Sequence, residues 1–329
     1  MSHGILALVV ALAVAQDRPV GKVALATGTV ETKAGDAASW AALAPGVEIP
    51  AGSWIRTPAK SKAIVTVSDG TELRVDENTE ILLEEVRKIT LKSGRFWGRL
   101  AAGGVPMQLR ADRTRAETAG SIFELRHDIG KKITGLIMIQ GKANVASRKG
   151  HQDLAQGYGC ETNDGVLNTP DQAGDIILPT LWLNELLAAR SKDDPELLKR
   201  MEIMLENLGF FKPVDPYEVG FRGLGERSVP YLLAYLKKSD PTAEGERRAA
   251  ALKIIGDLAS PALAPELATL LKDPEPEVRA AAARGLKRMT GQDLGFDEAY
   301  WKGEQVEKGG AAWADWLKNN AAKLETPKK

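Results

Sequence analysis

The stretch Ala63–Val75, which reads AIVTVSDGTELRV, decides the fold class of the N-terminal half. Two runs rich in Val, Ile and Thr flank Asp69-Gly70, and such a pair between β-prone runs is a strong local signal for a hairpin. A two-residue type I′ loop needs positive φ at both central residues, which glycine accepts freely and aspartate tolerates. This loop predicts that Thr66 lies opposite Leu73. The apolar face of the hairpin is then expected to contain Ile64, Thr66, Leu73 and Val75.

Residues 20–168 continue the same pattern. Short β-prone segments such as Lys22–Thr27 and Thr134–Ile139 alternate with turn signals such as Pro45-Gly46. Regularly spaced short strands with glycine-containing turns are typical of an all-β domain. We therefore predict an antiparallel all-β sandwich or roll in this half of the chain, with a short β-solenoid as the alternative.

A polar, turn-rich segment follows, and after it the apolar residues recur at spacings of three and four, which predicts helices. Part of this half repeats itself, because Val229–Lys237 aligns with Ala264–Lys272 and Arg248–Ala251 aligns with Arg279–Ala282. Helix pairs repeated at such an interval predict a short α-solenoid. A last helix, Ala311–Leu324, is expected to cap its open end.

The chain begins with an apolar run at residues 5–15 that ends in the small-x-small pattern Ala13-Val14-Ala15. This is the shape of a cleaved secretory signal peptide, and the run is too short to span a bilayer comfortably. No Lys or Arg precedes it, so an uncleaved N-terminal anchor and a buried strand are alternatives. We expect a periplasmic or secreted mature chain without a membrane span. The predicted regions are a signal peptide at 1–16, a β domain at 20–168, a linker at 169–178, a helical connector at 179–225, repeats at 226–291 and a C-terminal cap at 292–325.

Composition excludes several function classes. The 329 residues contain 44 basic and 44 acidic side chains, so a diffuse electrostatic attraction to nucleic acid or anionic lipid is not expected. The one cysteine, Cys160, excludes an intramolecular disulfide and a thiolate metal cluster, and we expect it to be a buried, inert thiol. His127 is expected at a surface turn and has no partner at metal-ligand spacing. We predict no cofactor, no metal and no catalytic site.

One basic neighbourhood is the candidate partner-binding site. It consists of Arg110, Arg113, Arg115 and Arg126. These cations are suited to an acidic protein partner, and the alternative is an ordinary solvated face.

The order of motifs in the N-terminal half resembles the FecR domain of extracytoplasmic bacterial regulators. The matching elements are Gly28-x-Val30, Leu43-x-Pro45-Gly46, Gly52 to Thr57, Asp69-Gly70-Thr71-x-Leu73-x-Val75, Asn78-Thr79, Leu91-x-x-Gly94, Glu117 to Phe123, Leu136 to Val145 and Leu154 to Gly157. Ala119-Gly120 stands where the family usually has an arginine. The segment Asp273 to Leu286 resembles a short HEAT repeat.

The FecR resemblance implies extracytoplasmic sensing and regulation through protein contacts. Full regulators of that family also have a cytoplasmic anti-sigma segment and a membrane span, which we do not expect here, so direct control of a sigma factor is not predicted. The alternative function is binding of cell-envelope glycan through exposed tryptophans, and it depends on Trp54, Trp97 and Trp182. The C-terminal tryptophans Trp301, Trp313 and Trp316 are expected to belong to the cap, with an exposed aromatic patch as the alternative.

Overall fold

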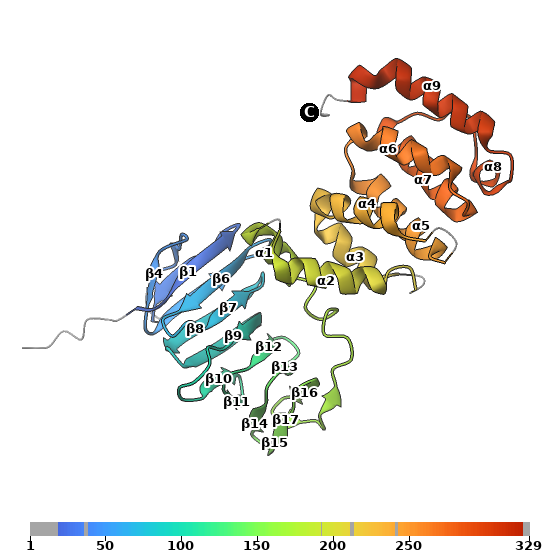
Figure 1. Ribbon diagram of the computed structural model, residues 1–329. Coiled ribbons are helices and arrows are strands. Elements are labelled where there is room, and N and C mark those ends of the chain that lie inside the picture. Colours follow the sequence, from blue (N-terminus) through green and yellow to red (C-terminus); the bar gives the residue numbers. More distant parts are fainter. Residues whose placement is uncertain (1–18, 36–38, 192, 211–213, 241–242, 325–329) are drawn as a thin grey trace, which may run out of the picture. The chain divides into compact units, whose positions relative to one another are not determined.

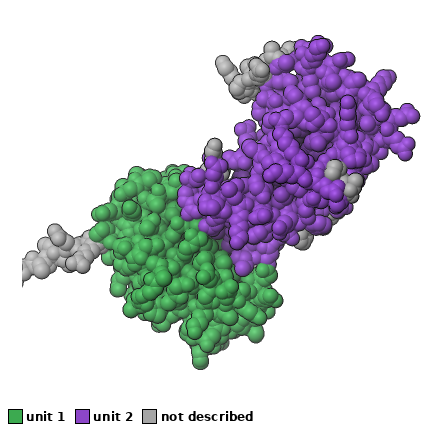
Figure 2. Space-filling model, in the orientation of Figure 1, with its two compact units in different colours: residues 1–174 green, residues 175–329 purple. Residues whose placement is uncertain are grey.

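The computed structural model describes residues 19–35, 39–191, 193–210, 214–240 and 243–324. The predicted signal peptide lies outside these residues. The chain divides into two compact units between Gly174 and Asp175, and each is described by itself below (Figure 2). The first unit is built of strands and the second of helices, which confirms the predicted change from β to α structure (Figure 1).

The strands of the first unit form two sheets (Figure 1). The first has the order β4 (Glu48–Pro50), β1 (Pro19–Thr27), β6 (Lys62–Val67), β7 (Glu72–Val75), β9 (Lys88–Arg99), β12 (Ile122–Asp128), β13 (Ile133–Gln140) and β16 (Tyr158–Asn163). Strand β16 also pairs with two short strands, β17 (Val166–Leu167) and β18 (Asp171–Gln172). The second has the order β3 (Ala41–Ala42), β2 (Glu31–Ala34), β5 (Ser53–Thr57), β8 (Thr79–Glu85), β9, β10 (Met107–Ala111), β11 (Thr114–Thr118), β14 (Ala143–Ser147) and β15 (Gly150–Leu154). All of these pairs are antiparallel except β9 with β10.

Strand β9 belongs to both sheets. Its first half pairs in the second sheet, and its second half, from Gly94 on, pairs in the first. Gly94 has φ +87°, and a Cβ there would lie 2.6 Å from the Cα of Thr79. Only glycine permits both the backbone conformation and the close approach, so this residue allows the strand to pass from one sheet to the other.

Alternate residues of both sheets form one hydrophobic core. It includes Ile55, Ile81 and Leu109 from the second sheet and Leu73 and Phe123 from the first, all with at most 1% of their surface exposed. Buried and exposed residues alternate along the strands, as expected where each of two packed sheets buries one face. The fold is therefore a β-sandwich, as the turn spacing predicts.

The register predicted for the first hairpin is wrong by one residue. Thr66 pairs with Glu72, and Val65 lies opposite Leu73. The loop has three residues instead of two, since the N–H of Val67 bonds to the carbonyl of Thr71 at 2.8 Å. Only Gly70, at φ +88°, has positive φ in this loop. A three-residue loop with one glycine avoids the strain of a second left-handed residue, and the shift places Val65 instead of Thr66 in the core.

The second unit consists of helices. They are α1 (Leu183–Arg190), α2 (Pro195–Glu206), α3 (Pro216–Gly223), α4 (Val229–Lys238), α5 (Gly245–Leu258), α6 (Ala264–Thr269), α7 (Pro276–Thr290), α8 (Glu298–Lys302) and α9 (Glu307–Leu324). Asp194 and Asp215 accept backbone N–H groups at the starts of α2 and α3, each with proline at the first helical position. None of the helices in the described part is long and apolar enough to cross a membrane.

Small residues let the two long repeat helices pack closely. A Cβ on Gly256 of α5 would lie 2.6 Å from the Cα of Gly285 of α7. At the C-terminal end, Trp301 and Trp313 have only 1% and 3% of their surface exposed, and Leu317 is also buried. This burial supports the interpretation of the last helix as a cap and contradicts the alternative of an exposed aromatic patch at these two rings.

Candidate partner-binding cleft

A cleft of about 640 Å³ opens at one end of the β unit. The turn between β7 and β8, the bend of β9, the hairpin of β12 and β13, and strand β16 supply its walls. Its charged lining residues are Asp76, Glu77, Arg95, Arg126, Asp128, Lys131 and Glu161. Seven charged side chains around one cleft provide several positions for ion pairs with a partner.

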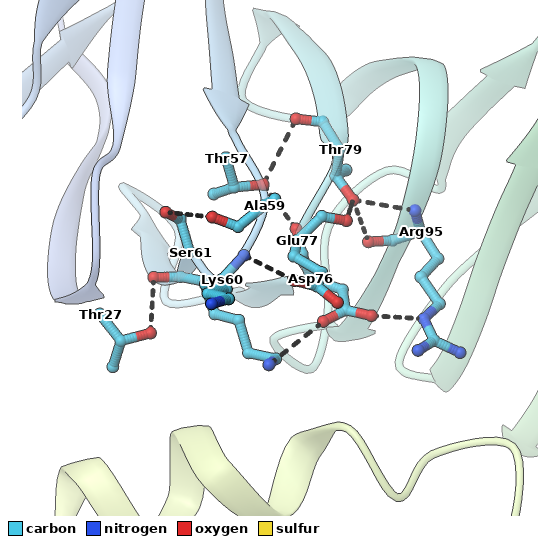
Figure 3. A network of polar contacts seen from close by, with 10 residues as sticks. Thr27, Thr57, Ala59, Lys60, Ser61, Asp76, Glu77, Thr79 and Arg95 are labelled. Carbon is cyan, nitrogen blue, oxygen red and sulfur yellow. Dashed lines mark hydrogen bonds and ion pairs between the residues drawn. The ribbon is translucent and has the colours of Figure 1, made fainter.

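Asp76 occupies the inner wall. The residue has only 3% of its surface exposed. Its carboxylate lies 2.6 Å from Nε of Arg95 and 3.7 Å from Nζ of Lys62 (Figure 3). Thr79 supports the same wall, because its hydroxyl accepts the N–H of Arg95 at 3.0 Å. The β7–β8 turn is fixed in addition by Glu77, whose carboxylate accepts the N–H of Lys60 at 2.6 Å (Figure 3). This wall is therefore a preorganised polar network.

Arg126 extends the cleft lining onto the neighbouring strand, where it lies directly across from Arg95 in the pairing of β12 with β9. It projects from β12 across Gly135 of β13 and pairs with Glu161 of β16. A Cβ on Gly135 would lie 2.6 Å from Nε of Arg126, so the glycine provides the space that the guanidinium crosses. Both members of this pair remain largely exposed, with 46% and 44% of their side-chain surfaces accessible. An exposed ion pair of this kind contributes little to stability, so its groups can exchange partners at small cost.

The hairpin tip completes the rim. Asp128 caps the turn, because its carboxylate accepts the N–H of Lys131 at 3.0 Å. This backbone hydrogen bond, together with the Lys131 ammonium, holds the pKa of Asp128 below its usual range. Asp128 therefore keeps its negative charge at the cleft entrance at neutral pH.

His127 does not lie at a surface turn, and this expectation was wrong. The residue belongs to β12, has 6% of its surface exposed and contacts the hydroxyl of Thr134 through Nδ1 at 2.9 Å. Strand β12 continues through Asp128, so the turn begins only after His127, and the imidazole lies against β13. Cys160 is buried as expected, with 5% exposed, and burial raises the pKa of its thiol.

The structure separates the four predicted arginines. Arg110 and Arg115 lie directly opposite each other on the outward face of the second sheet. Arg113 lies in the turn between them and pairs with Asp164 at 2.5 Å. Arg126 alone lines the cleft, on the outward face of the first sheet. Neighbours in sequence diverge because successive hairpins of a sandwich belong to different sheets.

The sequence motifs did not predict Asp76 and Arg95 as cleft residues. Asp76 directly follows the hairpin Ala63–Val75, and Arg95 directly follows the bend at Gly94. A charged residue directly after each of these two turn signals was the local feature that could have indicated the cleft. Their pairing depends on the register of β7 with β9, which no local motif determines.

The chemistry of the cleft is that of ion pairing. Within the described ranges, no three histidine, cysteine, aspartate or glutamate side chains are placed to hold a metal ion. The cleft cations Arg95, Arg126 and Lys131 are each near a carboxylate. A protein segment with charged side chains could exchange with these pairs without leaving an isolated charge.

Comparisons with known proteins agree with the fold. Residues 53–152 match the model of the FecR protein family, and residues 229–295 match the model of HEAT repeats. The chain therefore contains a FecR region followed by HEAT repeats, which confirms the resemblance predicted from its motifs.

Two crystal structures of a "putative anti-sigma factor" from Parabacteroides distasonis, at 2.50 and 1.65 Å resolution, are similar to part of the chain. Each has 17% sequence identity and a TM-score of 0.37, with 40% of this chain and 64% of that chain covered. This chain thus matches less than two thirds of the length of those proteins. A comparison with curated proteins gives no match.

Proposed function

We propose that this protein is a non-enzymatic extracytoplasmic adaptor that senses or regulates through contacts with another protein. The observation that carries the proposal is the combination, in one chain, of a FecR region with HEAT repeats, two modules suited to protein contacts. Location in the periplasm or outside the cell is part of the proposal and follows from the expected signal peptide.

The cleft around Arg126 is the proposed contact site of the β unit. Its preorganised wall at Asp76 and Arg95 would position a partner segment, and the exposed Arg126–Glu161 pair would exchange with the partner's charges. The solenoid would supply a second surface. Arg110, Arg113 and Arg115 would then contribute only if the partner also reaches the other sheet or the turn at its end.

Affinity capture from an envelope extract tests this site. Arg126→Glu should reduce recovery of the partner at least tenfold, since it places a negative charge beside Glu161 and removes the cation. Arg56→Glu is the control, because Arg56 forms a partly exposed pair with a glutamate on a strand of the other sheet, with Glu31 at 2.6 Å. Equal recovery with both variants would remove the cleft from the proposal.

A solenoid deletion tests the other module. Loss of partner recovery after removal of residues 226–324 would support a contact through the repeats. Unchanged recovery would show that the solenoid does not participate. The folded state of the β unit in the truncated chain is checked by its near-UV circular dichroism, which reports the packed aromatic pair Phe96 and Phe123.

Glycan binding is the second candidate. Trp97 and Trp182 are buried, which removes two of its three predicted rings. Trp54 is half-buried on the outward face of the second sheet, near Trp40, and the ammonium of Lys33 lies 5.1 Å from the Trp40 ring and 5.9 Å from the Trp54 ring. Retardation of the protein in gels that contain envelope polysaccharide, and its loss in Trp40→Ala, would support this candidate.

A further inference from the structure

Four turns of the β unit meet at one end of the sandwich. They join β10 to β11, β12 to β13, β14 to β15, and β16 to β17. A Cβ on Gly165 would lie 3.3 Å from the Cβ atoms of both Arg113 and Arg148, so three of the turns touch at this glycine. The fourth is joined through the N–H of Asp164, which bonds to the carbonyl of Lys132 at 3.0 Å.

Positive charge is concentrated on these turns. We call the set Arg113, Lys131, Lys132, Arg148 and Lys149 the basic turn cluster. All five side chains are exposed, and the same turns carry three exposed carboxylates, Asp112, Asp128 and Asp164. Arg148 and Lys149 have no carboxylate within ion-pair distance in the part of the chain that the structure describes. These turns are therefore net positive, with five cations and three carboxylates, although the whole chain is neutral.

Exposed aliphatic side chains lie among these cations. Ile129 has 61% of its surface exposed and Val166 has 48%. Ile129 belongs to the same turn as Lys131 and Lys132, and Val166 directly follows the turn at Asp164 and Gly165. Aliphatic residues flanked by cations at loop tips fit the boundary between lipid headgroups and acyl chains.

We infer that the basic turn cluster docks the β unit on an anionic lipid bilayer. The cations would contact phosphate headgroups, and Ile129 and Val166 would enter the interface beside them. An acidic protein bound in the cleft would contact Lys131 and Ile129, which line it. It would leave Val166, Arg148 and Lys149 uncovered. The inference goes beyond the proposed adaptor function and does not require it.

Vesicle sedimentation with the full chain tests this inference. The chain should bind vesicles of phosphatidylglycerol with phosphatidylcholine, should bind pure phosphatidylcholine much more weakly, and should be released by added salt. Each cation near an anionic bilayer strengthens partition about fivefold. Arg148→Gln/Lys149→Gln should therefore weaken binding by about 25-fold, as two such steps.

Lys22→Gln/Lys142→Gln is the matched control. It makes the same change in charge at two exposed lysines of the β unit, and Lys142 lies in the turn between β13 and β14, at the opposite end of these strands. This variant should bind the vesicles as the unchanged protein does. Ile129→Ser should weaken binding with little change in its salt dependence.

Two results would overturn the inference. One is the absence of phosphatidylglycerol-dependent binding at low salt. The other is equal binding by the Arg148/Lys149 variant and its control. Binding of soluble polyglutamate through the same residues, without vesicle binding, would assign the cluster to an acidic protein instead. Arg126→Glu should retain vesicle binding, so failure of the adaptor proposal would be seen separately.

Discussion

The buried ion pair between Arg248 and Asp273 allows a quantitative test of how the solenoid is stabilised. Arg248 lies on α5 and Asp273 precedes α7, and their exposed fractions are 2% and 7%. The guanidinium also donates to the carbonyl of Leu236 at 3.1 Å and to the hydroxyl of Ser239 at 2.6 Å. One side chain thus joins three segments of the repeat.

Asp273→Ala would leave the Arg248 charge buried without its carboxylate. Removal of one member of a buried pair typically costs about 3–5 kcal/mol. We expect the lower end, about 3 kcal/mol, because Arg248 keeps its bonds to Leu236 and Ser239. Asp273→Asn should cost less than Asp273→Ala, since an amide oxygen can still accept the N–H of Glu275, which bonds to the carboxylate at 3.1 Å.

Urea unfolding followed by far-UV circular dichroism at the helix band measures this cost, because the helices lie in the second unit. With a slope of about 2 kcal/mol per molar urea, the midpoint should fall by about 1.5 M. Glu266→Ala is the control. Its pair with Lys237 is exposed, at 3.4 Å, and should contribute less than about 1 kcal/mol. Equal midpoint shifts for Asp273→Ala and Glu266→Ala would refute the reasoning.

Three further predictions concern packing and protonation. Gly256→Ala should destabilise the helical unit by about 1–3 kcal/mol, because the new Cβ would meet the backbone of α7. A Cβ on Gly310 of α9 meets nothing within 4 Å, so the control Gly310→Ala should be neutral or stabilising in the same urea unfolding measurement. Burial raises the pKa of Asp194, but hydrogen bonds from Arg190 and from backbone N–H groups outweigh it and lower the pKa overall. The contribution of Asp194 to the free energy of unfolding is therefore present above the unfolded-state pKa of about 3.9 and is lost as pH falls through the lower folded-state pKa. Asp194→Asn should accordingly reduce the pH dependence of stability below about pH 4. Cys160 should react with iodoacetamide at pH 8 much more slowly in the folded protein than in urea, because its raised pKa disfavours the thiolate; equal rates would contradict its burial.

Sequence periodicity predicts the architecture well because it records which face of each element is buried. The change of apolar spacing near residue 174 coincides with the division into two units. The aligned segments Val229–Lys237 and Ala264–Lys272 both begin helices of the solenoid. In both cases the information is local, so a single sequence contains it.

Registers and relative positions were harder to predict because they depend on pairing at a distance. The loop at Gly70 has three residues because one left-handed glycine satisfies it, a choice that the Asp-Gly pair alone does not reveal. Arg110 and Arg126 are sixteen residues apart in sequence yet belong to different sheets. The cleft at Asp76 combines strands whose pairing is set by the bend at Gly94.

The neutral charge of the chain illustrates the same limit. An even balance of acidic and basic residues argues against a uniform field around the protein, but it gives no information about local concentration. The residues of the basic turn cluster come from three turns, separated in sequence by strands. Strands that return to the same end of a sandwich bring alternate turns together, so cations placed in those turns accumulate there. Charge that averages to zero along the chain can therefore be concentrated by the topology, and the position of each turn, rather than the total charge, determines which surface can attract an anionic partner.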